Sequence, residues 1–178
     1  MADYQAGVVV QRALLHMRAR LDERLIPRVT FTDPELAWVG ISEAQAMKTA
    51  KKINVLRWPY RENERAAAEG ALVGHVKVIT SRDGKILGAG IVGAAAGELI
   101  GTWALAISQS LNIKAMTEWV PAYPTLGEIN SRVAVSYYAA KAGNPTYARL
   151  SIFLLSSGEI PRAKGRACCA RTRARWCP

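Results

Sequence analysis

The fold is decided by a stretch near the start of the chain, residues 26–40, which reads IPRVTFTDPELAWVG. Residues 28–32 are β-branched or aromatic apart from one arginine, and such side chains suit the pleated surface of a strand. Residues 33–35, Asp-Pro-Glu, predict a turn. Residues 36–41 predict a second strand, so this stretch places strands early in the fold.

The same strand pattern returns further along the chain. Residues 53–58 predict a third strand, and residues 75–80 and 86–92 predict two more. Asp83-Gly84 joins the last two strands, because this dipeptide supplies the positive φ angles of a tight hairpin. Strands joined by so short a connection pair antiparallel.

Helical periodicity marks three longer segments: residues 4–24, residues 96–111 and residues 126 to about 140. Two capping boxes are expected at helix starts, one from Ser42 with Gln45 and one from Thr125 with Glu128. The predicted fold class is therefore α+β, a mostly antiparallel sheet with helices on one face.

Composition limits what the chain can be. Half of its 178 residues are hydrophobic and 21% are charged, which is the balance of a globular protein. The net charge is +10, but residues 142–178 hold seven basic residues and one acidic residue, which leaves only +4 for the other 141 residues. Nucleic-acid binding by the folded part is therefore not favoured.

Location is predicted from three further features. The first residues have neither the basic start nor the apolar stretch of a secretory signal. The most apolar region, residues 86–113, carries Glu98 in its middle, which disfavours a membrane span. Three cysteines do not make a disulfide framework, so we expect a cytoplasmic protein with no membrane partner.

A search for a self-contained active site finds little. Gly88 and Gly90 lie inside a predicted hairpin strand and Gly93 belongs to the turn after it, so the strand-turn-helix context of a phosphate-binding loop is absent. The two histidines, His16 and His75, have no other ligand type at metal-binding spacing. We interpret the chain as either a binding module or a piece of a larger enzyme.

Three blocks of sequence carry a family resemblance. Residues 26–40, residues 85–93 continuing through Glu98-Leu99-Ile100, and Tyr123-Pro124-Thr125-Leu126-Gly127-Glu128 follow one another at the expected spacing. Together they resemble the C-terminal dimerisation domain of pyridine nucleotide-disulfide oxidoreductases, the group that includes dihydrolipoamide dehydrogenase and mercuric reductase. The resemblance divides the chain into a helix leaving an absent FAD domain (1–24), the dimerisation domain (25–141) and a basic tail (142–178) that is disordered or non-native.

The resemblance implies a role for this domain. The parent enzyme would use FAD and NAD(P), and its C-terminal domain would form a homodimer and pack on the flavin domain of the parent chain. Tyr123 and Glu128 would be catalytic in trans, and Tyr123 and Pro124 would lie near the partner's flavin. No cofactor is expected in this piece alone, which we expect to be inactive by itself.

Tyr123 departs from the family pattern, in which a histidine is the acid–base partner of a redox-active thiol and a glutamate orients it. A phenol titrates far above neutral pH and is a poor base there. Mercuric reductases resemble this chain in having tyrosine at that place, which favours a mercuric-reductase-like parent. The alternatives are that Tyr123 only packs at an interface and that Glu128 only caps a helix.

The tail holds a second candidate site. Cys168 and Cys169 are adjacent thiols, which suit a soft metal ion, and the surrounding arginines lower thiol pKa values. The competing interpretation is a tail foreign to the family. The rival function is a non-enzymatic anion or nucleic-acid binder acting through this tail, which would lose affinity steeply with salt.

A homodimer requires an apolar interface, and the sequence offers five candidates for it. They are Trp103, Trp119, Ile129, Val133 and Tyr137. The competing interpretation for each is burial within one chain.

Overall fold

The computed structural model describes residues 2–49 and 52–142, with side chains as far as residue 139. Cys168 and Cys169 and the rest of the predicted basic tail lie outside the described residues. Among the residues that are described, no helix is both long enough and apolar enough to span a membrane.

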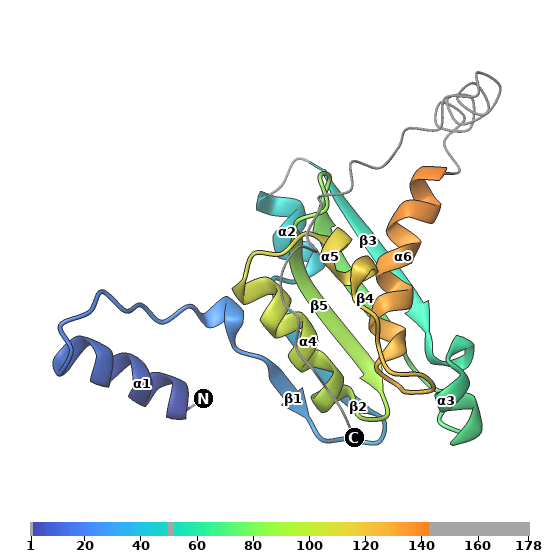
Figure 1. Cartoon of the computed structure of the whole chain (residues 1–178), viewed down its shortest axis with the longest axis horizontal. Helices are drawn as coiled ribbons and strands as arrows, with labels where there is room; N and C mark the ends of the chain where they lie inside the picture. The colour runs from blue at the N-terminus through green and yellow to red at the C-terminus, as the bar shows by residue number, and fades with distance from the viewer. Residues whose placement is uncertain (1, 50–51, 143–178) are drawn as a thin grey trace, which may run out of the picture. The chain divides into compact units, whose positions relative to one another are not determined.

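Five strands form one sheet in the order β1-β2-β5-β4-β3, and every neighbouring pair is antiparallel (Figure 1). The register places Trp38 opposite Gly90, Lys77 opposite Gly90 on its other side, and Arg57 opposite Lys77. The strands are β1 Arg28–Thr30, β2 Glu35–Gly40, β3 Ile53–Pro59, β4 His75–Ser81 and β5 Ile86–Gly93.

Six α-helices and two short 3-10 turns complete the described part of the chain. Their bounds are α1 Ala2–Ala13, α2 Glu43–Thr49, α3 Glu64–Ala68, α4 Ala96–Ser108, α5 Ile113–Glu118 and α6 Glu128–Ala142, with 3-10 turns at Glu23–Leu25 and Tyr60–Glu62. The predicted α+β class is therefore confirmed, and every strand predicted from the sequence is present.

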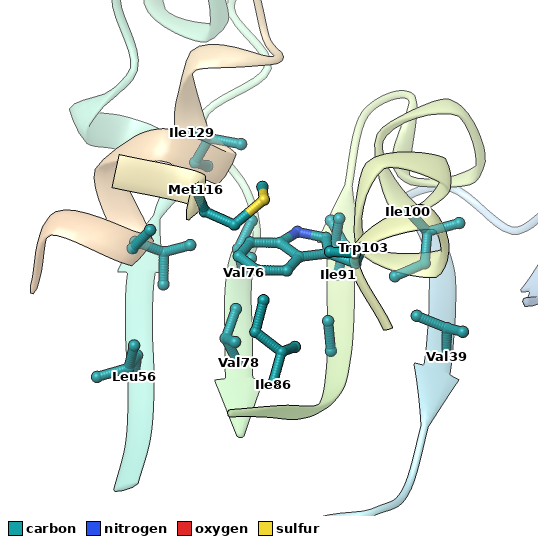
Figure 2. Close-up of a cluster of buried hydrophobic side chains, with 14 of the residues drawn as sticks. Val39, Leu56, Val76, Val78, Ile86, Ile91, Ile100, Trp103, Met116 and Ile129 are labelled. Atoms are coloured by element: carbon teal, nitrogen blue, oxygen red, sulfur yellow. The ribbon is translucent and has the colours of Figure 1, made fainter. Parts of the chain in front are cut away.

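The core lies between one face of the sheet and the helices that cover it. Side chains from β2, β3, β4 and β5 point toward Ile100 and Trp103 of α4, Met116 of α5 and Ile129 of α6 (Figure 2). The side chains of β4 alternate between the two faces of the sheet. Val76 and Val78 are fully buried on the core face, whereas His75 at the start of the strand is exposed. Full burial of an aliphatic side chain contributes about 1.5–3 kcal/mol.

The opposite face of the sheet is only partly covered. Leu36 and Trp38 of β2 are each 39% exposed there. Lys77 of β4 lies on the same face, and its ammonium contacts the carboxylate of Glu43 at the start of α2, 3.1 Å away. Glu43 also contacts Arg57 of β3 at 3.5 Å, so one acidic side chain links the beginning of α2 to two strands.

The first helix is shorter than predicted. α1 ends at Ala13 instead of residue 24, and His16 has a left-handed φ of 48°. None of its residues is buried, and Leu14 and Met17, two apolar residues of the helix predicted over residues 4–24, are 72% and 57% exposed. A short helix whose apolar stripe is not packed is marginal in water, which explains why periodicity alone overestimated its length.

One of the two predicted capping boxes forms. The Gln45 side-chain oxygen accepts from the Ser42 backbone amide at 2.9 Å, and the Ser42 hydroxyl oxygen accepts from the Gln45 amide at 3.3 Å. This reciprocal pair satisfies two amides at the start of α2, where no earlier turn of helix supplies acceptors.

Gly88 and Gly90 lie inside β5, where glycine weakens a strand, and a close approach of another element would explain both of them. A Cβ on Gly88 would overlap the backbone carbonyl of Ile41. A Cβ on Gly90 would find its nearest neighbour, the Ala37 carbonyl oxygen, at an ordinary contact distance of 3.8 Å. Of these two glycines, Gly88 is required by close packing and Gly90 is not.

We expect Gly88→Ala to lower the free energy of unfolding by about 1–3 kcal/mol, because a methyl group there forces β5 away from Ile41. Gly90→Ala is the matched control and should change stability by less than about 1 kcal/mol in either direction. Urea denaturation of both variants of the 178-residue chain measures the difference. Equal losses in the two variants would contradict this account of Gly88.

Candidate functional site

Two of the predicted site residues, Tyr123 and Pro124, lie on the loop that joins α5 to α6, residues 119–127. Tyr123 and Pro124 are joined by a cis peptide bond, and both side chains are exposed, that of Tyr123 to 65%. The Tyr123 hydroxyl donates a hydrogen bond to a carboxylate oxygen of Glu64 on α3. The phenol is therefore available at the surface of the chain and is not part of its core.

Glu128 is the first residue of α6 and lies close to this loop. Its side chain is 13% exposed, and its carboxylate accepts from Nε of Arg132 at 2.9 Å and pairs with a terminal guanidinium nitrogen at 2.7 Å. The structure thus gives Glu128 an arginine partner one turn along its own helix. Tyr123 is instead bonded to a glutamate that the sequence analysis did not single out.

The second predicted capping box, Thr125 with Glu128, does not form. The Thr125 hydroxyl donates to the Ala122 carbonyl at 2.6 Å, and the Glu128 carboxylate is engaged by Arg132. The helix starts through backbone bonds instead, in which the amides of residues 128, 129 and 130 donate to carbonyls three residues earlier. A sequence pattern alone could not separate these two ways of starting α6.

The charges around Tyr123 determine its protonation. Its hydrogen bond to Glu64 raises the pKa of the phenol, the negative charge of Glu64 raises it further, and Glu128 adds to the effect while Arg132 opposes it. Because the pKa of a phenol is already above neutral, Tyr123 carries its proton at physiological pH. The group can donate a hydrogen bond, and it cannot act as a base there.

Asn63 is a further residue of the site that sequence reasoning missed. It is 3% exposed, its side-chain oxygen accepts from the Ala66 amide at 2.9 Å, and its amide nitrogen donates to the Thr125 carbonyl at 3.1 Å. An asparagine before an alanine-rich segment is a recognisable helix cap. The contact to Thr125 leaves no trace in local sequence, because the two residues are far apart along the chain.

A buried hydrogen-bonded pair, Trp103 and Asn130, joins α4 to α6. The indole N–H of Trp103 donates to the side-chain oxygen of Asn130 at 2.8 Å, and the Asn130 amide donates to the Leu99 carbonyl at 3.1 Å. Both side chains are fully buried. Since Glu128 lies two residues before Asn130, this pair also fixes where the site's carboxylate is held.

The predicted interface patch is wrong for four of its five residues. Trp103, Ile129, Val133 and Tyr137 are at most 4% exposed and belong to the core of the single chain, whereas Trp119 is 37% exposed. Large apolar side chains are typical of cores and of interfaces alike, so composition did not distinguish them.

The glycine-rich segment of β5 is filled by protein. A Cβ on Gly93 would lie 2.5 Å from a ring carbon of Tyr60, and the space beside Gly88 is taken by Ile41. These glycines therefore serve packing, and they do not form the open cradle that a cofactor phosphate requires. Within the described ranges, no three His, Cys, Asp or Glu side chains gather as a metal site.

This architecture, an antiparallel sheet backed by α4, α5 and α6 with an exposed tyrosine loop before α6, defines a module that offers a proton-carrying group at its surface. The sequence model of the pyridine nucleotide-disulphide oxidoreductase dimerisation domain matches residues 26–133. The chain belongs to that family.

Relatives agree with this assignment and span much more sequence. The chain is 38% identical over 134 residues to a dihydrolipoyl dehydrogenase of Staphylococcus aureus, covering 75% of this chain and 28% of that enzyme. The crystal structure of LpdA from Mycobacterium tuberculosis superposes with a TM-score of 0.72 at 25% identity, over 76% of this chain and 30% of that one.

A further structural neighbour shares the fold. The flavoprotein disulfide reductase RclA of Escherichia coli, in a Cu(II) complex, matches with a TM-score of 0.67 at 23% identity, over 75% of this chain and 30% of that one. The chain thus spans less than a third of the length of each of these proteins.

We expect Asn130→Ala to lower the free energy of unfolding by about 2 kcal/mol, because it leaves the buried Trp103 indole N–H without its acceptor. Asn130→Asp keeps that acceptor but loses the donor to Leu99. Chemical denaturation followed by tryptophan fluorescence measures both variants. If Trp103→Phe removed none of the penalty of Asn130→Ala in the double variant, the hydrogen bond would not be its cause.

Proposed function

We propose that this chain is the C-terminal dimerisation domain of an FAD- and NAD(P)-dependent disulfide reductase, and that it supplies Tyr123 and Glu128 in trans to the partner's active site. The observation that carries the proposal is the exposed Tyr123-Pro124 loop placed directly before α6. The ring of this tyrosine is 65% exposed and is therefore accessible to the surface of a partner subunit.

The residues that would face the flavin are Tyr123 and Pro124, since both present exposed rings on one loop. The glycines of β5 do not fit a dinucleotide, so we assign FAD and NAD(P) to the remainder of the parent protein. The flavin, when bound there, supplies electron transfer between the nicotinamide and a disulfide. The dimerisation domain contributes surface and proton control to that chemistry.

Tyr123 would hold a proton at its phenol oxygen. The neighbouring carboxylates raise the pKa of this phenol, so it remains a donor throughout the physiological range. A neutral phenol can donate a hydrogen bond to a thiolate, but it withdraws a proton from a dihydrolipoamide thiol poorly. A mercuric-reductase-like parent therefore remains one form of this proposal, and a dihydrolipoamide dehydrogenase with weak activity is the other.

Self-association belongs to the same proposal, with a second copy and the parent's flavin domain as partners. A cytoplasmic setting also fits, because few cysteines and reactive thiol chemistry both suit a reducing compartment. The chain alone would not turn over.

We expect the 178-residue chain to sediment as a dimer at micromolar concentration. A chain truncated after Gly143 should sediment in the same way, because the proposal places the interface in the folded part. Analytical ultracentrifugation over a range of protein concentrations measures both. A monomer at every concentration would contradict self-association, and a dimer lost on truncation would favour the tail as the binding element.

Replacing Tyr123 by histidine tests its assignment to the active site. In a chimera that joins the flavin and nucleotide domains of the S. aureus dihydrolipoyl dehydrogenase to residues 26–142 of this chain, Tyr123→His should raise kcat for dihydrolipoamide oxidation by about 100-fold. The expected gain reflects an imidazole that titrates near neutral pH and acts as general base.

Tyr138→His is the matched control, because Tyr138 is also partly exposed, at 41%, but lies on α6 away from the loop. It should leave the turnover of the chimera unchanged. If Tyr123→His were as inert as this control in a chimera that folds and binds flavin, Tyr123 would not lie beside the reacting thiol.

A further inference from the structure

The start of α3 holds the tyrosine loop at two successive residues. Asn63 donates from its side-chain amide to the Thr125 carbonyl at 3.1 Å, and Glu64 accepts the hydrogen bond of the Tyr123 hydroxyl. One contact fixes the backbone of the loop, and the other fixes the phenol at its tip. The two contacts come from adjacent residues, so both hold the loop to the same place, the start of α3.

Asn63 uses both ends of its side chain. Its oxygen accepts from the Ala66 amide at 2.9 Å and so caps α3, while its nitrogen bonds the loop. The side chain is 3% exposed, so water competes little for either bond. An aspartate would offer no donor to Thr125, and a serine has an oxygen for the cap but does not reach across to the loop.

The start of α3 is itself bonded to residues of the core. The Asn63 backbone amide donates to the Tyr60 carbonyl at 2.9 Å, which ties α3 to the preceding 3-10 turn. Tyr60 is fully buried, its hydroxyl donates to the Ala94 carbonyl at 2.9 Å, and its ring packs against Gly93. The holding residues are thus tied to the end of β5.

The remaining charged groups leave Glu64 as the partner of the phenol. Glu128 is engaged by Arg132 on α6, at 2.7 Å. The groups that act on Tyr123 electrostatically are Glu64, Glu128 and Arg132, and only Glu64 is bonded to it. The glutamate expected from the family resemblance therefore acts on the phenol at longer range.

We propose that Asn63 and Glu64 are positioning residues for Tyr123, with Asn63 fixing the loop at Thr125 and Glu64 orienting the phenol in place of Glu128. The catalytic meaning of this arrangement rests on the proposed function, but the arrangement itself does not. The proposal makes the beginning of α3 part of the site. Glu128 and Arg132 then form an ion pair that acts on the phenol only through its charges.

A tyrosine titration tests the role of Glu64. In the full 178-residue chain carrying ring-¹³C tyrosine, the Tyr123 resonance is assigned with Tyr123→Phe and followed by NMR against pH. Glu64→Gln should lower the pKa of the Tyr123 phenol, because it removes the negative charge beside the phenol and leaves a neutral amide oxygen as the acceptor. Glu69→Gln, at the C-cap of the same helix and paired with Arg65, is the matched control and should leave that pKa unchanged.

Asn63→Ser tests the backbone contact, because serine keeps a capping oxygen and adds no charge. When Glu64→Gln is combined with Asn63→Ser, it should lower the pKa of the Tyr123 phenol by less than it does in the otherwise unaltered chain. At neutral pH, amide hydrogen exchange at residues 128–130 should be about tenfold faster, as expected for the loss of one hydrogen bond that supports the turn. Exchange at Ala66 should not change, since its cap is kept.

Two results would overturn the proposal. The first is a Tyr123 pKa that Glu64→Gln leaves unaltered. The second is that Asn63→Ser alters neither the amide exchange at residues 128–130 nor the effect of Glu64→Gln on the Tyr123 pKa. Circular dichroism verifies the fold at each pH. If alkaline pH unfolds the chain, the amide hydrogen exchange measured at neutral pH decides whether the proposal holds. Neither measurement needs flavin or a second subunit. Failure here is therefore distinguishable from failure of the proposed trans role, which sedimentation and turnover of the chimera decide.

Discussion

The burial of Trp103 between the sheet and the C-terminal helices is the interaction on which the arrangement of this chain depends. Its ring fills the space above β4 and β5, and its N–H needs an acceptor because water does not reach it. Asn130 is that acceptor, and Asn130 in turn bonds the Leu99 carbonyl. One buried polar contact therefore fixes the axial position of α6 against α4, which apolar packing alone would leave free to slide.

The position of α6 has consequences for the surface of the molecule. Once Asn130 is fixed, Glu128 and the loop before it have little freedom, and Asn63 takes up the Thr125 carbonyl from the other side. The loop is thus held by buried hydrogen bonds while the ring of Tyr123 stays exposed. The hydrogen bonds of the loop thus present the ring of Tyr123 in a fixed position to any surface that contacts it.

What the sequence predicted correctly depended on local signals. Alternating strands, the Asp83-Gly84 hairpin and the Ser42–Gln45 capping box are each encoded within a few residues, and all three are present in the structure, although in the hairpin Gly84 has the expected positive φ and Asp83 does not. α1 was overestimated because its apolar stripe has no packing partner among the described residues. Asn63 and Glu64 were missed because each acts on a loop about sixty residues away, and only the fold brings the two segments together.

The candidate site shows the same division. Exposure of Tyr123 followed from a family resemblance, but its bonding partner did not, because Glu64 and Glu128 offer the same carboxylate chemistry from different elements. Geometry decides between them: Glu128 shares a helix with Arg132, and a carboxylate already neutralised by a guanidinium is a weaker acceptor for a phenol than one without that pairing. Glu64 lies on a separate helix whose start faces the loop, so it can bond the phenol while Glu128 keeps its arginine. The proton on Tyr123 is consequently controlled from α3, and the sheet and the helices together fix the position of this hydrogen-bond donor.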